Sequence, residues 1–430
     1  MGEGGALRIG IAGLGSVGAG LIDSLVRRPD FAPASRRVAI GGISARSRTR
    51  PRPVDVSPYP WFDDPVALAG SADIDLFVEL IGGSDGPARA SVQAALAAGK
   101  PVVTANKALI AEHGAELAIA AEGAGAPLLF EAAVMGGTPA VKMLREAMVG
   151  DEVTGLAGIL NGTCNYILTE MEASGRPFAE VLAEAKRAGY AEADPTMDVG
   201  GFDAAHKITI LAALAFGCAP AIGAAEVEGI TEIELLDIRL AGALGYRIKL
   251  VASALRSEQG IAVAVHPALA PLDHPLARAG GVLNALFIEG KGIGRIFIQG
   301  PGAGAGPTAA AVLADIADAM TGAQRPVFQK PAAQLQPWST PPPGQTELRA
   351  YLRLLVRDEP GVIAAVSETL AEERVSIDSF LQRPTEGAAG VPIVLTTHSV
   401  AEARLRGAVA RIGALPMLLE PPRLIRIAPI

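Results

Sequence analysis

The chain has 430 residues, of which 50% are hydrophobic and only 4% aromatic, with 50 glycines and 32 prolines. This length predicts two or three domains, with cores built largely from Ala, Val, Leu and Ile. The net charge of −8 and the lack of a basic run argue against nucleic acid and against an anionic membrane surface as partners.

The first 150 residues alternate between strand and helix signals, which is the pattern of a parallel sheet covered by helices. The predicted strands are 7–12, 38–43, 74–80, 101–104 and 128–130, and the predicted helices are 17–27, 88–98 and 115–121. The Pro-rich stretch 50–60 is expected to be a surface excursion. We therefore predict a Rossmann-type α/β domain over residues 1–150.

A glycine turn follows the first predicted strand and opens the first predicted helix in a GxGxxG pattern. The first two glycines allow a tight turn and a close approach to a pyrophosphate, the third lets helix and strand pack, and the helix N-terminus attracts the anion. Because the strand–turn–helix context is right, we predict a dinucleotide site. The residues expected to bind it are Gly13, Gly15, Ser16, Val17 and Gly18.

The second predicted strand is followed by arginines and not by an acid. A site selective for NAD usually has an acid here for the ribose 2′-hydroxyl, whereas Arg46 and Arg48 could receive a 2′-phosphate. The alternative is a solvated loop. We predict that NADP is preferred, with NAD still possible.

A sheet-plus-helix domain is predicted over residues 151–330, and a Pro-rich linker over 331–345. Its predicted helices are 166–173, 178–188 and 203–216, and its predicted strands are 246–254, 261–266 and 296–299. The last unit, 346–430, gives strand 351–357, helix 363–372, strands 377–382 and 391–397, helix 400–411 and strand 424–427. This βαββαβ order predicts a ferredoxin-like fold.

The segment 188–211 concentrates acids and one lysine beside an apolar helix pattern. Asp203 and Lys207 are four residues apart, so on a helix they share a face. Glu192 and Asp198 lie upstream in a Pro- and Gly-punctuated stretch that can curl toward that face. An acidic rim around a lysine suits a small cationic substrate such as an amino acid, but the spacing fits a surface ion pair equally well.

Three further polar turns are candidates for the site. Thr104 and Lys107 follow a predicted strand, and ligands of open α/β sheets gather beyond the carboxyl ends of strands, so both are assigned to the cofactor side of the cleft. The alternative is that Lys107 is a surface residue, as a lone lysine at a strand end more often is. Gly162 and Thr163 open a helix whose backbone N–H groups could meet a carboxylate. Glu131 could hold a hard cation together with nearby carbonyls, although a capping role is the default interpretation.

The compartment is predicted from what the sequence lacks. Its first ten residues have neither the basic start nor the apolar core of a signal peptide. Cys164 and Cys218 cannot supply a disulfide framework, which fits a reducing cytosol. Residues 208–225 are uncharged, but Gly217 and Pro220 interrupt them, so a buried core helix is expected and not a membrane span. We predict a soluble, cytoplasmic protein.

Together these motifs resemble the homoserine dehydrogenase family. The matching blocks are GLGSVG (13–18), VELIGG (78–83), AGKPVVTANKAL (98–109), FEAAVMGGTP (130–139), GILNGTCNYIL (158–168), GYAEADPTMDVGGFDAAHK (189–207) and GPGAGAGPTA (300–309). The tail, with DEPGV after its first strand, resembles an ACT domain, a module that often binds amino acids. The resemblance implies the interconversion of L-homoserine and L-aspartate 4-semialdehyde with NAD(P), a step of threonine, methionine and isoleucine biosynthesis.

The resemblance also implies a role for each residue. Lys207 and Lys107 would serve proton transfer and substrate binding, with Asp203 assisting Lys207. Glu192 and Asp198 would contact the amino group of the substrate, and Gly162 with Thr163 its other end. A structural sodium or potassium ion would be held at Glu131, Val134, Gly136 and Thr138, the last three through backbone carbonyls. In one departure, Gly200-Gly201 stands where an acid or polar residue is expected before the glycine, which puts fine substrate affinity in question.

Two other classes compete with this interpretation. A semialdehyde dehydrogenase would need a thiolate, and Cys164 opens a helix where a thiol pKa can drop, although a packing role is the alternative. An amino-acid sensor would use only the ACT-like tail, but the intact Lys107, Asp203 and Lys207 set argues against it. For the tail we expect feedback control by threonine or an extended subunit interface. A homo-oligomer, dimer or tetramer, is also expected.

Overall fold

The computed structural model describes residues 6–31, 37–322, 325–342, 344–382 and 390–429. They form two compact units that interleave along the chain. The first unit comprises 1–156, 203–225 and 283–338, and the second comprises 157–202, 226–282 and 339–430. Segments 203–225 and 283–338 thus pack with the first unit, although they follow residue 150.

A six-stranded parallel sheet forms the centre of the first unit, in the order β3-β2-β1-β4-β5-β6. Its strands are β1 (Leu7–Ala12), β2 (Val38–Ser44), β3 (Trp61–Phe62), β4 (Leu76–Glu79), β5 (Val102–Thr104) and β6 (Leu128–Leu129). This order is that of the doubly wound dinucleotide-binding fold, so the predicted Rossmann-type domain is confirmed. Only β3 had no predicted counterpart; its two residues directly follow the Pro-rich stretch 50–60 that was interpreted as a surface excursion.

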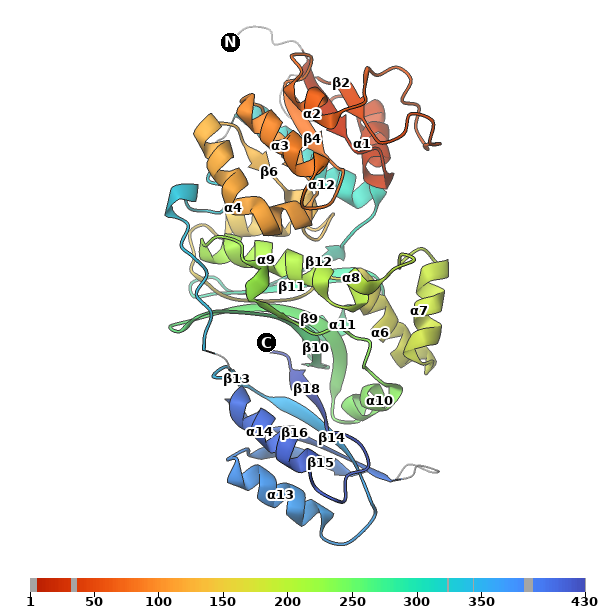
Figure 1. Cartoon of the computed structure of the whole chain (residues 1–430), viewed down its shortest axis with the longest axis vertical. Coiled ribbons are helices and arrows are strands. Elements are labelled where there is room, and N and C mark those ends of the chain that lie inside the picture. The colour runs from red at the N-terminus through yellow and green to blue at the C-terminus, as the bar shows by residue number, and fades with distance from the viewer. Residues whose placement is uncertain (1–5, 32–36, 323–324, 343, 383–389, 430) are drawn as a thin grey trace. The chain divides into compact units, whose positions relative to one another are not determined.

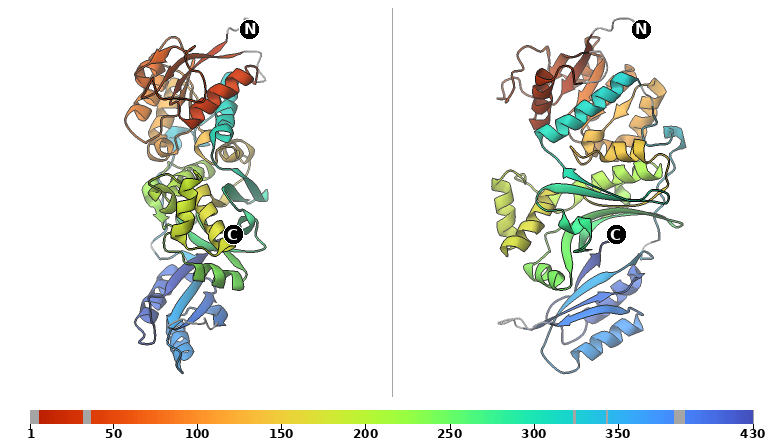
Figure 2. Two further views of the ribbon diagram at one scale, coloured as in Figure 1. Left: turned by 90° about the vertical axis from the view of Figure 1, so that its right-hand side faces the viewer. Right: turned by 180° about the vertical axis from the view of Figure 1, so that it is seen from behind.

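Helices cover both faces of this sheet (Figures 1 and 2). They are α1 (Ser16–Arg27), α2 (Pro65–Gly70), α3 (Pro87–Ala97), α4 (Lys107–Ala124) and α12 (Ala305–Thr321). Helix α12 lies against α1, where a Cβ on Gly20 would stand 2.8 Å from the Ala305 carbonyl oxygen. Helix α4 is much longer than the predicted 115–121, since Gly114 and Gly123 weaken the local helix signal but not the packed helix.

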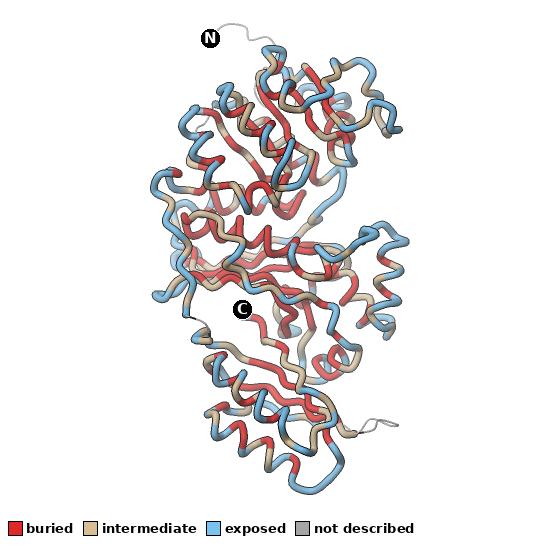
Figure 3. Tube along the Cα trace, viewed as in Figure 1, coloured by how far each residue is buried: buried red, intermediate tan, exposed pale blue. Residues whose placement is uncertain are grey.

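The first unit also contains the helix α9 (Phe202–Phe216), from Asp203 onward, and the antiparallel hairpin of β11 (Leu283–Gly290) and β12 (Gly294–Pro301). Every residue of α9 from 203 to 216 is buried, as the continuous red segment in Figure 3 shows. The uncharged run is therefore a core helix, as predicted. No helix in the described part of the chain is long and apolar enough to cross a membrane.

In the second unit, the long antiparallel hairpin of β9 (Tyr246–Ser257) and β10 (Gly260–Pro271) pairs along its whole length. Strand β7 (Val153–Ile159) leads into this unit. The helices here are α6 (Gly162–Ser174), α7 (Phe178–Arg187), α8 (Thr196–Val199), α10 (Leu235–Ala243) and α11 (Pro275–Arg278). Asn161 is the N-cap of α6: its Oδ1 accepts from the Cys164 N–H at 2.8 Å and satisfies one donor of the first turn.

The C-terminal part of the second unit has the predicted βαββαβ order, with its strands arranged β18-β14-β16-β15. Its elements are β14 (Ala350–Val356), α13 (Val362–Glu372), β15 (Ile377–Gln382), β16 (Val391–Thr397), α14 (Glu402–Gly413) and β18 (Arg423–Ile427). The start predicted for the last helix was wrong by two residues, because β17 (Val400–Ala401) pairs with β13 (Glu347–Leu348). Strand β18 also pairs in parallel with β10 through Ala268↔Arg426 and Leu269↔Ile427.

Backbone hydrogen bonds hold the middle of the predicted linker 331–345 in both units. In the first unit, the Ala219 N–H donates to the Gln336 carbonyl at 3.1 Å. In the second unit, the Ile261 N–H donates to the Ser339 carbonyl at 2.7 Å. Pro343 lies outside the described residues, so the third proline of the run cannot be placed.

Candidate active site

In the glycine turn of the first unit, two of the three glycines pack against backbone atoms and the third faces open space. Gly13 has φ +99°, and a Cβ there would stand 2.2 Å from the Leu80 carbonyl oxygen. A Cβ on Gly18 would stand 2.1 Å from the Gly13 carbonyl oxygen. At Gly15 a Cβ would meet nothing within 4 Å. The first and third glycines are therefore needed by the chain itself, and the second faces space in which a dinucleotide phosphate fits.

This turn borders a cavity of about 470 Å³ that also reaches the loop after β2. Arg46 lines the cavity, and so does Arg50, which the sequence did not single out. Arg48 does not line it: its guanidinium pairs with Asp63, Nε–Oδ1 and Nη2–Oδ2 both being 3.0 Å, and lies 5.5 Å from the Trp61 ring centre. The exposed guanidinium of Arg48 is thus paired with an acid fifteen residues downstream in the chain, and its predicted contact with the cofactor stays a prediction.

One carboxylate in the first unit holds both predicted lysines. Asp203 Oδ2 accepts from Lys207 Nζ at 2.8 Å, and Asp203 Oδ1 lies 3.1 Å from Lys107 Nζ. The Lys207 and Asp203 side chains are each only 10% exposed, against 38% for Lys107. The interpretation as a surface ion pair is therefore wrong. Two lysines share one carboxylate here, so the group can carry more positive than negative charge, and an excess of positive charge stabilises an oxygen anion.

His206 lies beside this group on α9. Burial, followed by the positive charge of Lys107, lowers the pKa of His206 below its ordinary 6.5, so the ring is neutral at pH 7. Its Nδ1 is buried and has no partner among the described residues. The histidine therefore adds no further positive charge to the lysine pair.

A buried acid that we had not assigned shapes the strand ends beside Lys107. Glu79, at the end of β4, accepts from the Ile81 N–H at 2.7 Å, the Gly82 N–H at 3.1 Å and the Thr104 hydroxyl at 2.6 Å. Burial raises the pKa of Glu79. The Thr104 hydroxyl also accepts from the Asn106 N–H at 3.0 Å. The side chain of Thr104 thus fixes the turn before Lys107. The sequence interpretation missed Glu79, although an acid at the end of an apolar strand is a recognisable sign of a functional or structural role.

In the second unit, the start of α6 and the acid-rich segment are joined through Asp198. Asn161 Nδ2 donates to Asp198 Oδ1 at 2.8 Å, and Cys164 Sγ donates to the Asp198 carbonyl at 3.1 Å. The Thr163 hydroxyl donates to the Tyr190 carbonyl at 2.7 Å. Asn161 is the residue that the sequence interpretation missed, although it stands directly before the predicted helix turn. Gly162 opens α6 as predicted.

Cys164 is fully buried, and its sulfur acts as a hydrogen-bond donor. A donating thiol is protonated, which fits a packing residue and not a thiolate nucleophile. Glu192 is exposed in the loop that precedes α8. At Gly200 a Cβ would stand 2.5 Å from the Thr196 carbonyl oxygen, so the glycine found at this departure from the family pattern permits a tight end to α8.

Glu131 caps a helix, as the default interpretation held. Its carboxylate accepts from the Val141 N–H at 3.2 Å and the Lys142 N–H at 2.6 Å, at the start of α5 (Ala140–Lys142). Burial and the neighbouring Asp315 raise the pKa of Glu131 to about 7. The Thr138 carbonyl already accepts from the Ala140 N–H at 2.8 Å.

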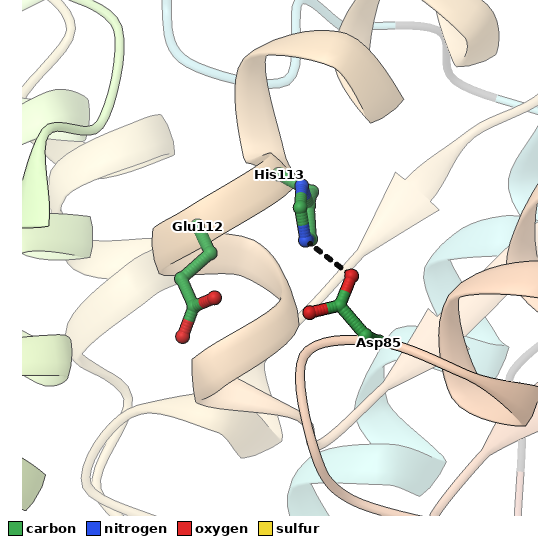
Figure 4. Close-up of side chains that lie close together, drawn as sticks. All are labelled: Asp85, Glu112 and His113. Carbon is green, nitrogen blue, oxygen red and sulfur yellow. Dashed lines mark hydrogen bonds and ion pairs between the residues drawn. The ribbon is translucent and has the colours of Figure 1, made fainter.

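A different group of acids and histidine is found where α4 begins. Asp85 and His113 are joined at 3.1 Å, with Glu112 close by (Figure 4). Asp85 and Glu112 are exposed, and an exposed acidic group of this kind is common without any metal. We assign no ion to it.

A Rossmann sheet with an open glycine turn, and two lysines paired with one carboxylate, fit the class of dinucleotide-dependent dehydrogenases that act on a hydroxyl or carbonyl carbon. Models of known families match at 13–131 (homoserine dehydrogenase, NAD binding domain), 139–317 (homoserine dehydrogenase) and 350–416 (ACT domain). A homoserine dehydrogenase of Pseudomonas aeruginosa is 43% identical over 98% of each chain. The chain belongs to the homoserine dehydrogenase family, and it is an NAD(P)-dependent oxidoreductase of amino-acid biosynthesis.

Other similar proteins agree with this assignment. A homoserine dehydrogenase of Corynebacterium glutamicum is 39% identical over 99% of this chain and 96% of its own. The crystal structure of a homoserine dehydrogenase from Thiobacillus denitrificans has a TM-score of 0.91 at 39% identity and covers 99% of both chains. A hyperthermophilic archaeal homoserine dehydrogenase in complex with NADPH has a TM-score of 0.66 at 27% identity, over 75% of this chain and 99% of that one.

Proposed function

We propose that Lys207, Asp203 and Lys107 carry the proton chemistry of the interconversion of L-homoserine and L-aspartate 4-semialdehyde. The observation that supports this proposal most directly is that the Asp203 carboxylate contacts both lysines. A bound nicotinamide supplies or accepts the hydride. As the hydride leaves the alcohol carbon, the hydroxyl proton passes to a neutral lysine Nζ; in the reverse direction the ammonium returns it to the oxygen.

The amino-acid end of the substrate is assigned to the second unit. Asp198 and Glu192 are proposed to meet the ammonium group, because carboxylates pair with it through charge-assisted hydrogen bonds. The first turn of α6, at Gly162 and Thr163, offers backbone N–H groups suited to the carboxylate. The experiment adds homoserine and NADP to the purified protein and follows the absorbance of the reduced nicotinamide. A folded protein that binds cofactor but gives no signal would favour the amino-acid sensor.

We propose NADP as the preferred cofactor, supported by Arg46 and Arg50 lining the cavity beside the glycine turn. Arg46→Ala should raise KM for NADP about tenfold or more, because a hydrogen bond to a charged group is worth about 1.5–3 kcal/mol, and should leave KM for NAD nearly unchanged. The matched control is Arg48→Ala, whose guanidinium pairs with Asp63. An equal loss of NADP selectivity in the two variants would refute the assignment of Arg46.

The Glu131 turn is proposed to bind a structural sodium or potassium ion. One observation supports a cation near this turn: Glu131 and Asp315 are both buried, although Asp315 Oδ1 already has the Lys142 Nζ at 3.5 Å. The bonds already made by Glu131 and by the Thr138 carbonyl mean that these oxygens would have to share their lone pairs with the ion. The identity of the ion stays a prediction from the resemblance.

We propose threonine as the effector of the ACT domain. Titration of threonine into the full-length protein should lower the rate of homoserine oxidation, whereas valine, a β-branched control without the hydroxyl, should not. The test uses the full-length protein, because deleting the ACT domain from about Gly344 onward would also remove β18, which pairs with β10. Full activity at saturating threonine would refute the proposal and leave the ACT domain as a contributor to a subunit interface in a dimer or tetramer.

A further inference from the structure

Arginines of the ACT sheet contact the segment 226–237, which precedes and opens α10. Arg426 on β18 reaches Glu228 with Nη1–Oε2 at 3.2 Å and Glu226 with Nη2–Oε2 at 3.8 Å. Its Nη2 also donates to Glu402 Oε1 at 2.8 Å. The Arg426 side chain is only 14% exposed, whereas the Glu228 and Glu226 side chains are 48% and 66% exposed, so these pairs are shielded from solvent on the arginine side alone.

Two more arginines of the same sheet contact this segment further along. Arg353 on β14 donates from Nε to Asp237 Oδ1 at 2.8 Å and from Nη2 to Glu234 Oε2 at 3.0 Å. The Arg353 side chain is 5% exposed and the Asp237 side chain 0%. Arg423 Nη2 donates to the Glu232 carbonyl at 2.5 Å. The ACT sheet therefore holds segment 226–237 at several points.

The other side of this segment lies against α8, which carries Asp198. The Ile230 N–H donates to the Val199 carbonyl at 2.8 Å. At Gly229 the approach is so close that a Cβ would stand 2.2 Å from the same carbonyl oxygen. Val199 directly follows Asp198 in the chain. A shift of segment 226–237 would thus move the backbone that places the Asp198 carboxylate.

We propose that the ACT sheet positions the substrate-binding turn through segment 226–237, with Arg426 and Glu228 as the positioning pair. The chain of contacts runs from Arg426 to Glu228, through Gly229 and Ile230 to Val199, and so to Asp198. This inference rests on the proposed assignment of Asp198 to the substrate. It makes the ACT domain a support of homoserine binding even without an effector.

The test measures steady-state kinetics of full-length variants. Arg426→Met and Glu228→Gln should each raise KM for homoserine about fivefold and leave KM for NADP and kcat near wild type. The KM of the double variant for homoserine should not exceed the higher of the two single-variant values, because both changes remove the same contact. Both variants should fold. In Arg426→Met, the buried Glu402 still has Arg406 as a partner at 2.6 Å. In Glu228→Gln, the altered side chain is 48% exposed.

The matched control is Arg349→Met, since Arg349 pairs with Asp378 inside the ACT domain at 2.9 Å. Its KM for homoserine should equal that of wild type. An unchanged KM in Glu228→Gln, or an equal rise in Arg349→Met, would overturn the positioning role. Asp198→Asn separates the two levels of the argument. A normal KM in Asp198→Asn refutes the assignment of Asp198 and with it the positioning inference, whereas a raised KM there with a normal KM in Arg426→Met refutes the positioning alone.

Discussion

Replacing Lys207 by Met should lower kcat for homoserine oxidation about a thousandfold, because general acid–base transfer contributes about 10²–10⁴ to a rate. The side chain is buried and held by Asp203 at 2.8 Å, so no solvent group takes its place readily. KM for homoserine should change much less. Steady-state kinetics give both values, and fluorescence titration of NADPH shows whether cofactor binding is intact.

The Lys207→Met protein is expected to fold, because Asp203 keeps Lys107 as a partner at 3.1 Å and is not left as an unpaired buried charge. Glu192→Ala is the control with the opposite signature. It removes an exposed carboxylate from the loop before α8, so it should raise KM for homoserine more than it lowers kcat. If the two variants gave the same kinetic signature, this division between chemistry and recognition would be wrong.

The second large effect is expected at the glycine turn. Gly18→Ala should lower the free energy of unfolding by about 2 kcal/mol or more and should abolish cofactor binding, since overpacking forces the backbone to move. The added Cβ would stand 2.1 Å from the Gly13 carbonyl oxygen, which is backbone and cannot rotate away. Urea unfolding gives the stability, and NADPH titration gives the affinity.

Gly15→Ala is the matched control, because a Cβ there would meet nothing within 4 Å. Its unfolding curve should therefore match that of wild type, while its affinity for NADPH falls because the second glycine is the one that lets a pyrophosphate approach. A stable Gly18→Ala protein with normal NADPH affinity would contradict the roles assigned to the turn.

The sequence alone determined those features that depend on neighbours in the chain. The parallel-sheet alternation, the glycine turn, the buried 208–216 stretch and the βαββαβ tail were all predicted, because periodicity and turn residues are local signals. The i, i+4 spacing also predicted that Asp203 and Lys207 would meet. Motif blocks in chain order were specific enough to predict the family.

Tertiary structure decided what depends on partners distant in the chain. The burial of the Asp203–Lys207 pair and its contact with Lys107, which follows β5, are visible only in the folded chain. Arg46 and Arg48 are equivalent in the sequence, yet Arg46 lines the cavity and Arg48 pairs with Asp63. The arginine contacts to segment 226–237 likewise join residues far apart in sequence. Local sequence patterns do not show which distant charged residue a side chain will contact. Only the folded chain therefore distinguishes a charge exposed to solvent from one that is buried and paired.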